Sequence, residues 1–373
     1  MTVRVSGKVV APTGVIMQGC VETDGDRITA VAEYPSIRDG HWIVPGFVDI
    51  HTHGGGGHSF TTGDAEAARG AAEFHLAHGT TTLLASLVSS PYELMRDATM
   101  ALAPLVDKGV LAGVHYEGPY LSAARCGAQN PAYLRDPSLD ELGELLDLGA
   151  GAVRMVTIAP ELPGALDAIR LLVSRGVVAA IGHTDATYAQ TLAAIAAGAT
   201  VGTHLFNGMP APHHREPGPV FALLNSPSVV CELVADGIHL HEGTLTFATS
   251  VAGPDRAALI TDAMAAAGMA DGEYELGGQA VVVADRAARL VAPDGGVGAI
   301  AGSTLTMDVA LRQAVQAGVP VPDACRMAAG TPANAIGLGA RLGALIPGWR
   351  ADLVVLDNDL QVVRVMRAGT WLH

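Results

Sequence analysis

The sequence is poor in aromatic and charged residues, which make up 4% and 16% of its 373 residues. Alanine and glycine dominate instead, so we expect a large core of small side chains. Positive charge is scarce, because only two lysines occur and the formal net charge is −15. This charge argues against nucleic acid or an anionic membrane as a partner. An anionic substrate would need a local positive patch.

Signals for secretion or membrane insertion are also missing. The first ten residues, MTVRVSGKVV, contain charges and no apolar core of a signal peptide. No uncharged apolar run of about 18 residues suggests a membrane span. The four cysteines lie far apart and form no Cys-x-x-Cys pair. We therefore expect a cytoplasmic protein with four free thiols, and two disulfides are an alternative without support.

One pattern repeats eight times through the middle of the chain. A short apolar run ends in polar residues, and a helical stretch rich in alanine and leucine follows. The runs are 47–53, 81–89, 111–119, 153–161, 177–185, 200–208, 229–239 and 257–263. Such runs are typical of parallel strands that are buried on both faces. The pattern predicts an α/β fold with a (β/α)₈ TIM-like barrel, and a doubly wound sheet is the alternative.

The position of the polar residues favours the barrel. They gather at the carboxyl end of each run: His51, His53, Glu117, His183, His204, Asp236, His239 and Asp262. All eight strands of a barrel open their carboxyl ends onto one face, where barrel enzymes carry their chemistry. In a doubly wound sheet, only the strand ends near the switch point meet.

The two ends of the chain read as short strands without helices between them. We expect residues 1–44 and 344–373 to form one small β-sandwich domain, and residues 45–343 to form the catalytic barrel. A β-like segment near 273–299 precedes the last helices. We predict that this segment is a β-hairpin insertion.

Five candidate metal ligands end predicted strands. His51 and His53 are two residues apart, so a strand would point both side chains to the same face. Glu117, His183 and His204 end other strands, and imidazoles with a carboxylate suit zinc, iron and other first-row metals. A single histidine is more often a core or surface residue, but five ligands at strand ends favour a metal site. Many binuclear barrel hydrolases bridge their two metal ions with a carboxylated lysine at the end of the fourth strand. No lysine ends the fourth run here, so Glu117 is the candidate bridge if two ions bind.

Asp262 ends the eighth run in the sequence LITDAM. Near a metal-bound water, this carboxylate would serve as the general acid/base, and a helix N-cap is the alternative role. The sequence His53-Gly54-Gly55-Gly56 matches the oxyanion loop of esterases. No serine, however, has glycine at both −2 and +2, and no GxxxxGK[ST] phosphate loop occurs. A serine esterase site and a phosphate-binding loop are therefore excluded.

Anion contacts are predicted after the sixth run. The segment 204–218, HLFNGMPAPHHREPG, offers Asn207, Arg215 and consecutive backbone N–H groups. His239 and the turn at 300–304 add further donors. The planar guanidinium of Arg215 suits a phosphate, and a surface arginine is the alternative.

Taken in order, these motifs resemble the amidohydrolase superfamily and, within it, the N-acetylglucosamine-6-phosphate deacetylases. The segments that carry the resemblance run from 45 to about 307: PGFVDIHTHG, VHYEGPYL, CGAQNPAY, TIAPE, IGHTDA, THLFNGM, REPG, VADGIH, TDAM and AGSTLTM. HLFNGM, REPG and VADGIH are specific to these deacetylases. The closing segment 343–357 is shared more broadly among amidohydrolases.

The resemblance implies a role for each matching residue. Glu117, His183 and His204 would hold the main divalent metal, and His51 and His53 a second one. One or two ions per subunit are thus expected, with zinc first and iron or another first-row metal as alternatives. Asp262 would be the catalytic acid/base. The implied substrate contacts are Ala128, Gln129, Asn207, Gly208, Arg215, His239, Ile300, Ala301 and Gly302.

The implied reaction is hydrolysis of the acetamide of N-acetyl-D-glucosamine 6-phosphate to D-glucosamine 6-phosphate and acetate. Metal-bound hydroxide would attack the amide carbonyl, and Asp262 would transfer the proton. The resemblance also implies a homodimer in which a phosphate ligand comes from the neighbouring chain. Two alternatives stay open: an amidohydrolase for a different amide or N-acetyl amino sugar phosphate, and an inactive barrel that acts as a scaffold.

Two positions near the predicted mouth of the barrel stand out. Gln129 replaces a histidine that commonly touches the sugar in these deacetylases. Glutamine can hydrogen-bond a hydroxyl group, but it does not titrate near neutral pH. Cys126 precedes it, and one hypothesis is a loop thiol that modulates the site through metal or redox chemistry. A space-filling or solvent-facing thiol is the alternative.

Overall fold

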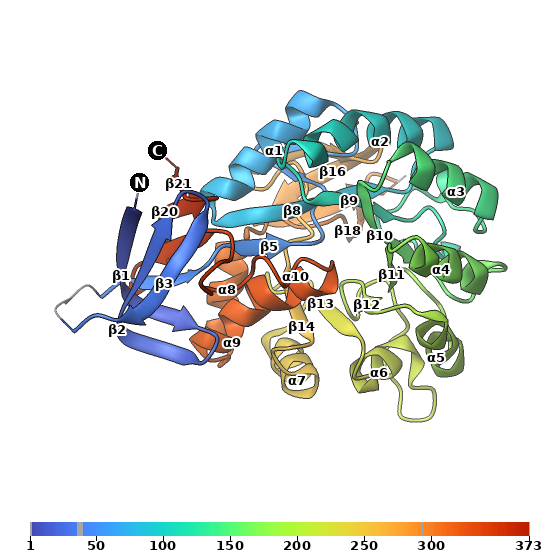
Figure 1. Ribbon diagram of the computed structural model, residues 1–373. Coiled ribbons are helices and arrows are strands. Elements are labelled where there is room, and N and C mark those ends of the chain that lie inside the picture. The colour runs from blue at the N-terminus through green and yellow to red at the C-terminus, as the bar shows by residue number, and fades with distance from the viewer. Residues whose placement is uncertain (1, 36–39, 293, 373) are drawn as a thin grey trace.

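The structure is a computed structural model that describes residues 2–35, 40–292 and 294–372 (Figure 1). Residues 1, 36–39, 293 and 373 of the predicted domain ranges lie outside the described residues. Each of the eight predicted strands is present: β5 (Phe47–Asp49), β8 (Thr80–Val88), β9 (Gly113–Glu117), β10 (Val153–Ile158), β11 (Val178–Ile181), β12 (Val201–Gly202), β13 (Val230–Val234) and β14 (Ala257–Ile260). They pair in chain order in one parallel sheet.

The sheet closes into a barrel beyond its first and last strands. The backbone N–H of Asp262 donates to the carbonyl of His51 at 2.9 Å, and the N–H of His53 donates to the carbonyl of Ala263 at 2.7 Å. Every residue of β8 is buried, as expected for a strand covered on both faces. The predicted barrel is confirmed, and the doubly wound alternative is wrong.

One helix follows each barrel strand and covers its outer face (Figure 1). These helices are α1 (Ala65–Ala77), α2 (Tyr92–Asp107), α3 (Leu139–Leu148), α4 (Ala165–Ser174), α5 (Tyr188–Ala197), α6 (Gly218–Asn225), α7 (Glu242–Ala252) and α8 (Met307–Gln316). Local sequence sets their ends, since Thr187 and Gln190 form a capping box on α5. Two short helices, α9 (Val321–Cys325) and α10 (Thr331–Ala335), flank a π-helical turn. Within the described residues, no helix is both long and apolar enough to cross a membrane.

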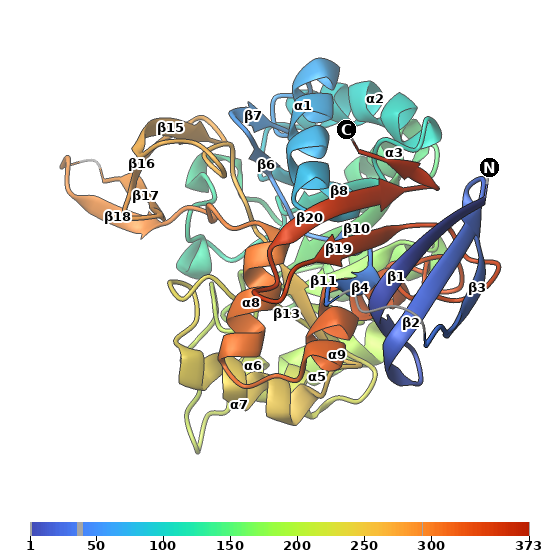
Figure 2. The same ribbon diagram turned by 90° about the vertical axis from the view of Figure 1, so that its left-hand side faces the viewer.

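The two ends of the chain meet in one seven-stranded sheet (Figure 2). Its strands are β1 (Thr2–Ala11), β2 (Gly14–Asp24), β3 (Arg27–Glu33), β4 (Trp42–Pro45), β19 (Leu353–Leu356), β20 (Val362–Arg367) and β21 (Thr370–Trp371). Strand β4 joins the two halves, because it pairs parallel to β1 and antiparallel to β19. The small β region that the sequence predicts as a sandwich is therefore one continuous sheet with a core of its own.

The insertion before α8 is larger than the predicted hairpin. It is a four-stranded antiparallel sheet of β15 (Gly272–Leu276), β16 (Gln279–Ala284), β17 (Ala287–Val291) and β18 (Val297–Ile300) that projects from the barrel (Figure 2). Its second turn places Asp285 and Arg286 at φ values of 50° and 67°. Tight hairpin turns with such angles usually carry glycine or asparagine. Because this turn carries no glycine, the sequence does not mark the additional strand pair.

Candidate active site and metal centre

Six of the predicted residues lie together at the carboxyl ends of five barrel strands. All six side chains are buried: His51, His53, Glu117, His183, His204 and Asp262. They form two groups within which the candidate ligand atoms lie within 4.8 Å of one another. One group is His51, His53 and Asp262, and the other is Glu117, His183 and His204. The barrel thus brings distant predicted ligands to one point.

The carboxylate of Glu117 lies between the two groups. Its Oε1 atom is 2.9 Å from Nε2 of His204 and 3.0 Å from Nε2 of His183. Its Oε2 atom is 3.3 Å from Nε2 of His53. Oε1 also lies 3.5 Å from Nε2 of His51, so the carboxylate borders both groups, as the predicted bridging position requires.

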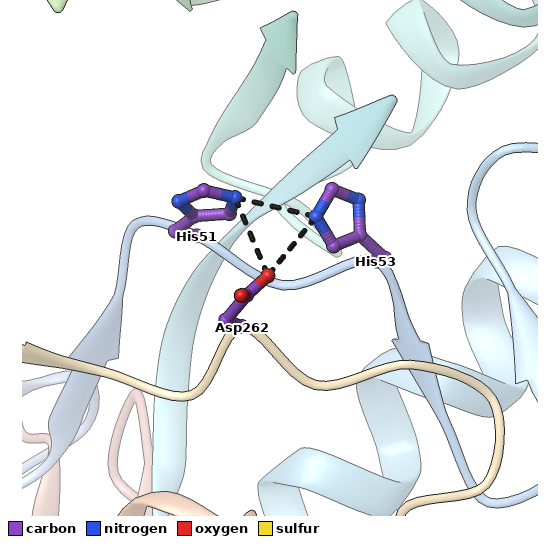
Figure 3. A group of neighbouring side chains, drawn as sticks. All are labelled: His51, His53 and Asp262. Carbon is purple, nitrogen blue, oxygen red and sulfur yellow. Dashed lines mark hydrogen bonds and ion pairs between the residues drawn. The ribbon is translucent and has the colours of Figure 1, made fainter. Parts of the chain in front are cut away.

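Asp262 approaches the histidine pair from the adjoining strand end, across the seam where the barrel closes. Its Oδ1 atom lies 3.2 Å from Nε2 of His53 and 3.6 Å from Nε2 of His51. Figure 3 shows the three side chains pointing toward one another. The position of Asp262 is set by β14, whereas the two histidines follow β5, so the closure of the barrel creates this contact.

The outer ring nitrogens of two histidines are held by backbone carbonyls. Nδ1 of His53 lies 3.2 Å from the carbonyl oxygen of Ser86, and Nδ1 of His183 lies 2.8 Å from that of Arg125. A carbonyl oxygen only accepts hydrogen bonds, so each Nδ1 carries a hydrogen. In the neutral ring, the lone pair is then on Nε2, which faces the centre.

Pairs of these Nε2 atoms lie unusually close together. They are 3.2 Å apart in His51 and His53, and 3.1 Å apart in His183 and His204. Two lone pairs that face each other at this distance repel unless a proton or a cation lies between them. Imidazole nitrogens with carboxylate oxygens are the donor set of zinc and other first-row metals. The residues present therefore fit a divalent metal.

Electrostatics in this buried cluster favour positive charge between the carboxylates. Burial alone would lower the pKa of His53, but Asp262 and Glu117 outweigh burial and raise this pKa to about 9. Burial would raise the carboxyl pKa values, yet the neighbouring histidines hold the pKa of Glu117 and that of Asp262 below their ordinary range. Both carboxylates are ionised near neutral pH, and a bound cation would satisfy them.

Glu232 is a buried partner of both groups that the sequence interpretation missed. Its Oε2 atom lies 3.0 Å from Nδ1 of His51 and accepts the backbone N–H of His204 at 3.1 Å. Such outer partners orient metal-binding imidazoles. The signal in the sequence was a lone glutamate inside the apolar run at 229–239, which a buried strand tolerates only when the charge is paired.

Three of the converging residues have backbone conformations that are rare for residues other than glycine. The φ angles of His183, His204 and Asp262 are 45°, 24° and 50°. Such conformations persist where the surrounding structure imposes them, and they concentrate at functional sites. At Gly208 the φ angle is 61°, and an added Cβ would lie 2.9 Å from Nδ1 of His183. Only glycine lets this loop cover that ring.

A cavity of about 210 Å³ opens onto the cluster. The site residues predicted from the sequence that line this cavity are His53, Glu117, Ala128, Gln129, His183, His204, Asn207, Gly208, His239, Asp262, Ile300 and Gly302. Ala301 is buried under the four-stranded sheet, and Cys126 lies half-buried in the adjoining loop. Arg215 is exposed outside this lining, with its guanidinium 2.9 Å from Nε2 of His214.

Comparisons with known proteins agree with this architecture. Residues 42–372 match the amidohydrolase family. The chain belongs to this family. The N-acetylglucosamine-6-phosphate deacetylase of Lysinibacillus sphaericus is 35% identical over 88% of this chain and 85% of its own. The N-acetylgalactosamine-6-phosphate deacetylase of Escherichia coli O157:H7 is 36% identical over 89% of this chain and 88% of its own.

A solved structure is similar to this amidohydrolase over almost its whole length. It is a mutant of the N-acetyl-D-glucosamine-6-phosphate deacetylase of Mycobacterium smegmatis in complex with N-acetyl-D-glucosamine 6-phosphate. The two chains are 46% identical with a TM-score of 0.95, and the alignment covers 99% of each.

His239 lies at the mouth of the amidohydrolase barrel between Asp236 and Asp262. Its Nδ1 atom lies 2.6 Å from Oδ2 of Asp236, and its Nε2 atom lies 3.9 Å from Oδ2 of Asp262. Burial would lower the pKa of His239, but Asp236 outweighs burial and raises it. The imidazole is thereby oriented into the cavity as a donor. Asp236 was predicted only as a polar residue at a strand end, although its spacing of three residues from His239 suits this contact.

A second cavity, of about 300 Å³, lies between the small sheet and the helices α9 and α10. The charged residues among its described lining residues are Asp255 and Arg326, which pair with each other at 3.0 Å. No group of metal-binding side chains among the described residues lies there. The candidate active site of this amidohydrolase is therefore the mouth of the barrel.

Proposed function

We propose that the protein hydrolyses the acetamide of N-acetyl-D-glucosamine 6-phosphate to D-glucosamine 6-phosphate and acetate. One observation carries the proposal: residues of two candidate metal-binding groups, among them the ionised Asp262, border one cavity with further polar lining residues. The deacetylases to which the chain is similar act on phosphorylated N-acetyl amino sugars, as their names state. The protein is therefore a metal-dependent deacetylase.

The resident ion belongs at Glu117, His183 and His204, and a second one at His51, His53 and Asp262. We propose zinc, with iron or another first-row metal as the alternative, because imidazole and carboxylate ligands suit these ions. When bound, such a cation lowers the pKa of water to about 7 and polarises an amide carbonyl.

Asp262 acts as the general acid/base. Its carboxylate is ionised near neutral pH and lies in the cavity lining, so it is ready to accept the proton of the attacking water. The same residue then donates this proton to the departing amine. Glu232 and the Ser86 carbonyl hold His51 and His53 in place around it.

Asn207, Gly208, His239 and the 300–302 turn hold the sugar phosphate. Asn207 and Gly208 follow β12, and His239 follows β13, so the donors surround the cavity from adjacent strands. Binding energy from the phosphate fixes the acetamide near the reacting groups, which is how a remote group accelerates the chemistry.

Two chains form a homodimer in which Arg215 completes the phosphate site of the neighbouring subunit. The support is the position of Arg215: it is exposed, lies outside the lining of its own cavity, and has the His214 ring, with no carboxylate at salt-bridge distance among the described residues, as the neighbour of its guanidinium. A guanidinium binds phosphate oxygens in pairs. We place the enzyme in the cytoplasm, because all four cysteines, which lie in the described ranges, are unpaired thiols.

A panel of N-acetyl sugars tests the proposed reaction. Release of acetate is measured with the 6-phosphates of N-acetylglucosamine, N-acetylgalactosamine and N-acetylmannosamine, and with unphosphorylated N-acetylglucosamine. We expect the highest kcat/KM for N-acetylglucosamine 6-phosphate and a large loss without the phosphate. The similarity to an N-acetylgalactosamine-6-phosphate deacetylase supports N-acetylgalactosamine 6-phosphate as the second candidate substrate. No release of acetate from any of the phosphorylated sugars by the metal-loaded protein would refute the proposal.

A further inference from the structure

Gln129 has an amide orientation that its surroundings dictate. The side chain is buried, and the backbone N–H of Ser89 donates to its Oε1 atom at 2.8 Å. A backbone N–H can only donate, so the atom that it meets must be the amide oxygen. The NH₂ group of Gln129 therefore points the other way, toward the cluster of candidate ligands.

The NH₂ group donates to Oε2 of Glu117 at 2.6 Å, inside the protein. Hydrogen bonds to a carboxylate are stronger and more directional than those between neutral groups. Oε2 is also the oxygen that lies 3.3 Å from Nε2 of His53, whereas Oε1 is nearer His183 and His204. The amide thus holds the carboxylate oxygen that faces His53, whereas Oε1 lies 3.5 Å from Nε2 of His51.

We propose that Gln129 is a positioning residue for Glu117 that sets how tightly the His51–His53–Asp262 group binds a divalent cation. The bond from Gln129 fixes the rotation of the carboxylate, so that Oε1 serves the first group and Oε2 the second. An oxygen of a carboxylate has a second lone pair, which stays available to a cation. This role rests on the proposed function and goes beyond the sugar contact that the sequence suggested for Gln129.

The first group depends less on this bond. Oε1 of Glu117 is held by His183 and His204, whose rings have their own partners or backbone constraints. Without the Gln129 amide, Oε1 keeps its contacts with His183 and His204, but Oε2 loses its hydrogen-bond donor and the carboxylate can pivot about Oε1. Loss of an outer partner of a ligand typically weakens metal binding about 10- to 100-fold, and we assign this loss to the second group alone.

A matched control residue contacts the same loop from the four-stranded sheet. Gln279, on β16, donates from its Nε2 atom to the carbonyl of Ala128 at 2.6 Å, so it also anchors the loop. Among the described residues, no hydrogen bond joins Gln279 to Glu117. Gln129→Met and Gln279→Met each remove an amide of equal size that anchors this loop, and only the first removes the bond to the carboxylate.

The test is a titration of metal-free protein with Co²⁺, followed by calorimetry and by the visible absorption of the bound ion. We expect two equivalents in the wild type and in Gln279→Met. In Gln129→Met, we expect the Kd of the more weakly bound Co²⁺ to rise by about tenfold or more. The Kd of the more tightly bound Co²⁺ should stay unchanged. Gln129→Asn keeps the amide but is one methylene shorter, so it cannot span both contacts and should show the same selective loss.

Three results would overturn the inference: both equivalents bind normally in Gln129→Met and Gln129→Asn, both weaken equally, or the wild type takes up a single equivalent. Retention of the tighter equivalent shows that each variant is folded. Substrate is absent from this titration, so its outcome is independent of whether N-acetylglucosamine 6-phosphate is hydrolysed. Failure of the deacetylase assay with two normal equivalents would sink the proposed function alone.

Discussion

Oδ1 of Asp262 and Nε2 of His53 lie 3.2 Å apart across the seam where the barrel closes. The two residues are far apart in the sequence, and backbone hydrogen bonds between the ends of β5 and β14 keep them together. The aspartate is ionised, and its second oxygen lies 3.9 Å from Nε2 of His239. It can therefore exchange a proton with a group in the cavity while its other oxygen stays with the histidine pair.

Asp262→Asn should abolish most turnover. An amide of the same shape cannot accept the proton of the attacking water, so we expect kcat to fall by about 10² or more. Substrate affinity and the tighter metal equivalent should remain, since the asparagine keeps the shape of the site. Rapid-quench kinetics and metal analysis on the same preparation check this, and near-normal kcat would rule out Asp262 as the acid/base.

Asp236→Asn provides the contrast. It weakens the bond that orients His239 but leaves Asp262 in place. We expect a rise in KM for the sugar phosphate that exceeds the fall in kcat, because His239 is assigned to binding. If kcat falls as far as in Asp262→Asn while KM stays unchanged, His239 belongs to the proton transfer and its assignment is wrong.

Removal of the metal should inactivate the enzyme reversibly. The paired Nε2 atoms and the two carboxylates lose their cation, and the substrate carbonyl loses its activation. Because the ion binds only the folded chain, a cation at 100 times its Kd adds about 2.7 kcal/mol to the free energy of unfolding. Dialysis against a chelator, then an activity assay and a thermal melt with and without Zn²⁺, checks both effects. Full activity in protein shown by elemental analysis to be metal-free would contradict them.

The proposed exchange of Arg215 between subunits predicts complementation. Arg215→Ala and Asp262→Asn are each expected to be nearly inactive, the first through a higher KM. In a mixed dimer, the subunit with an intact Asp262 receives the intact Arg215 of its neighbour. After unfolding and refolding of an equal mixture, we expect activity of about a quarter of the wild type. No recovery, with mixed dimers confirmed by mass spectrometry, would place Arg215 in its own subunit or outside the site.

The sequence predicted the barrel and its ligands because both follow from local patterns. The eight strands are continuous apolar runs, and the spacing of His51 and His53 predicts a shared face, although β5 ends at Asp49, before both histidines. Contacts that depend on the closed barrel left weaker signals. The partners of Glu232 come from β5 and β12, and Gln129 reaches Glu117 only because a loop folds back over the site. No local pattern encodes such distances.

Asp308→Asn tests a charge that stabilises the fold away from the site. Asp308 is buried at the start of α8, and Arg312 donates to its Oδ2 atom at 2.9 Å, while Nδ1 of His78 lies 3.3 Å from Oδ1. Burial would raise its pKa, but His78, Thr306 and Arg312 together lower it to about 2. An unfolded aspartate has a pKa of about 3.9. The ionised form is thus favoured by folding.

The sign of the pH dependence follows from this lowered pKa. The stabilisation is complete above pH 4 or so and disappears as the pH falls toward about 2, where the folded form also becomes protonated. We expect Asp308→Asn to lose about 2 kcal/mol of unfolding free energy at neutral pH, and less at about pH 3. Asp167→Asn is the control, because Asp167 pairs with Arg170 on the exposed surface of α4 and should cost less than about 0.5 kcal/mol. Urea unfolding of both variants at the two pH values measures the differences, and a loss for Asp308→Asn that grows as the pH falls would show that the ionised carboxylate does not stabilise the fold.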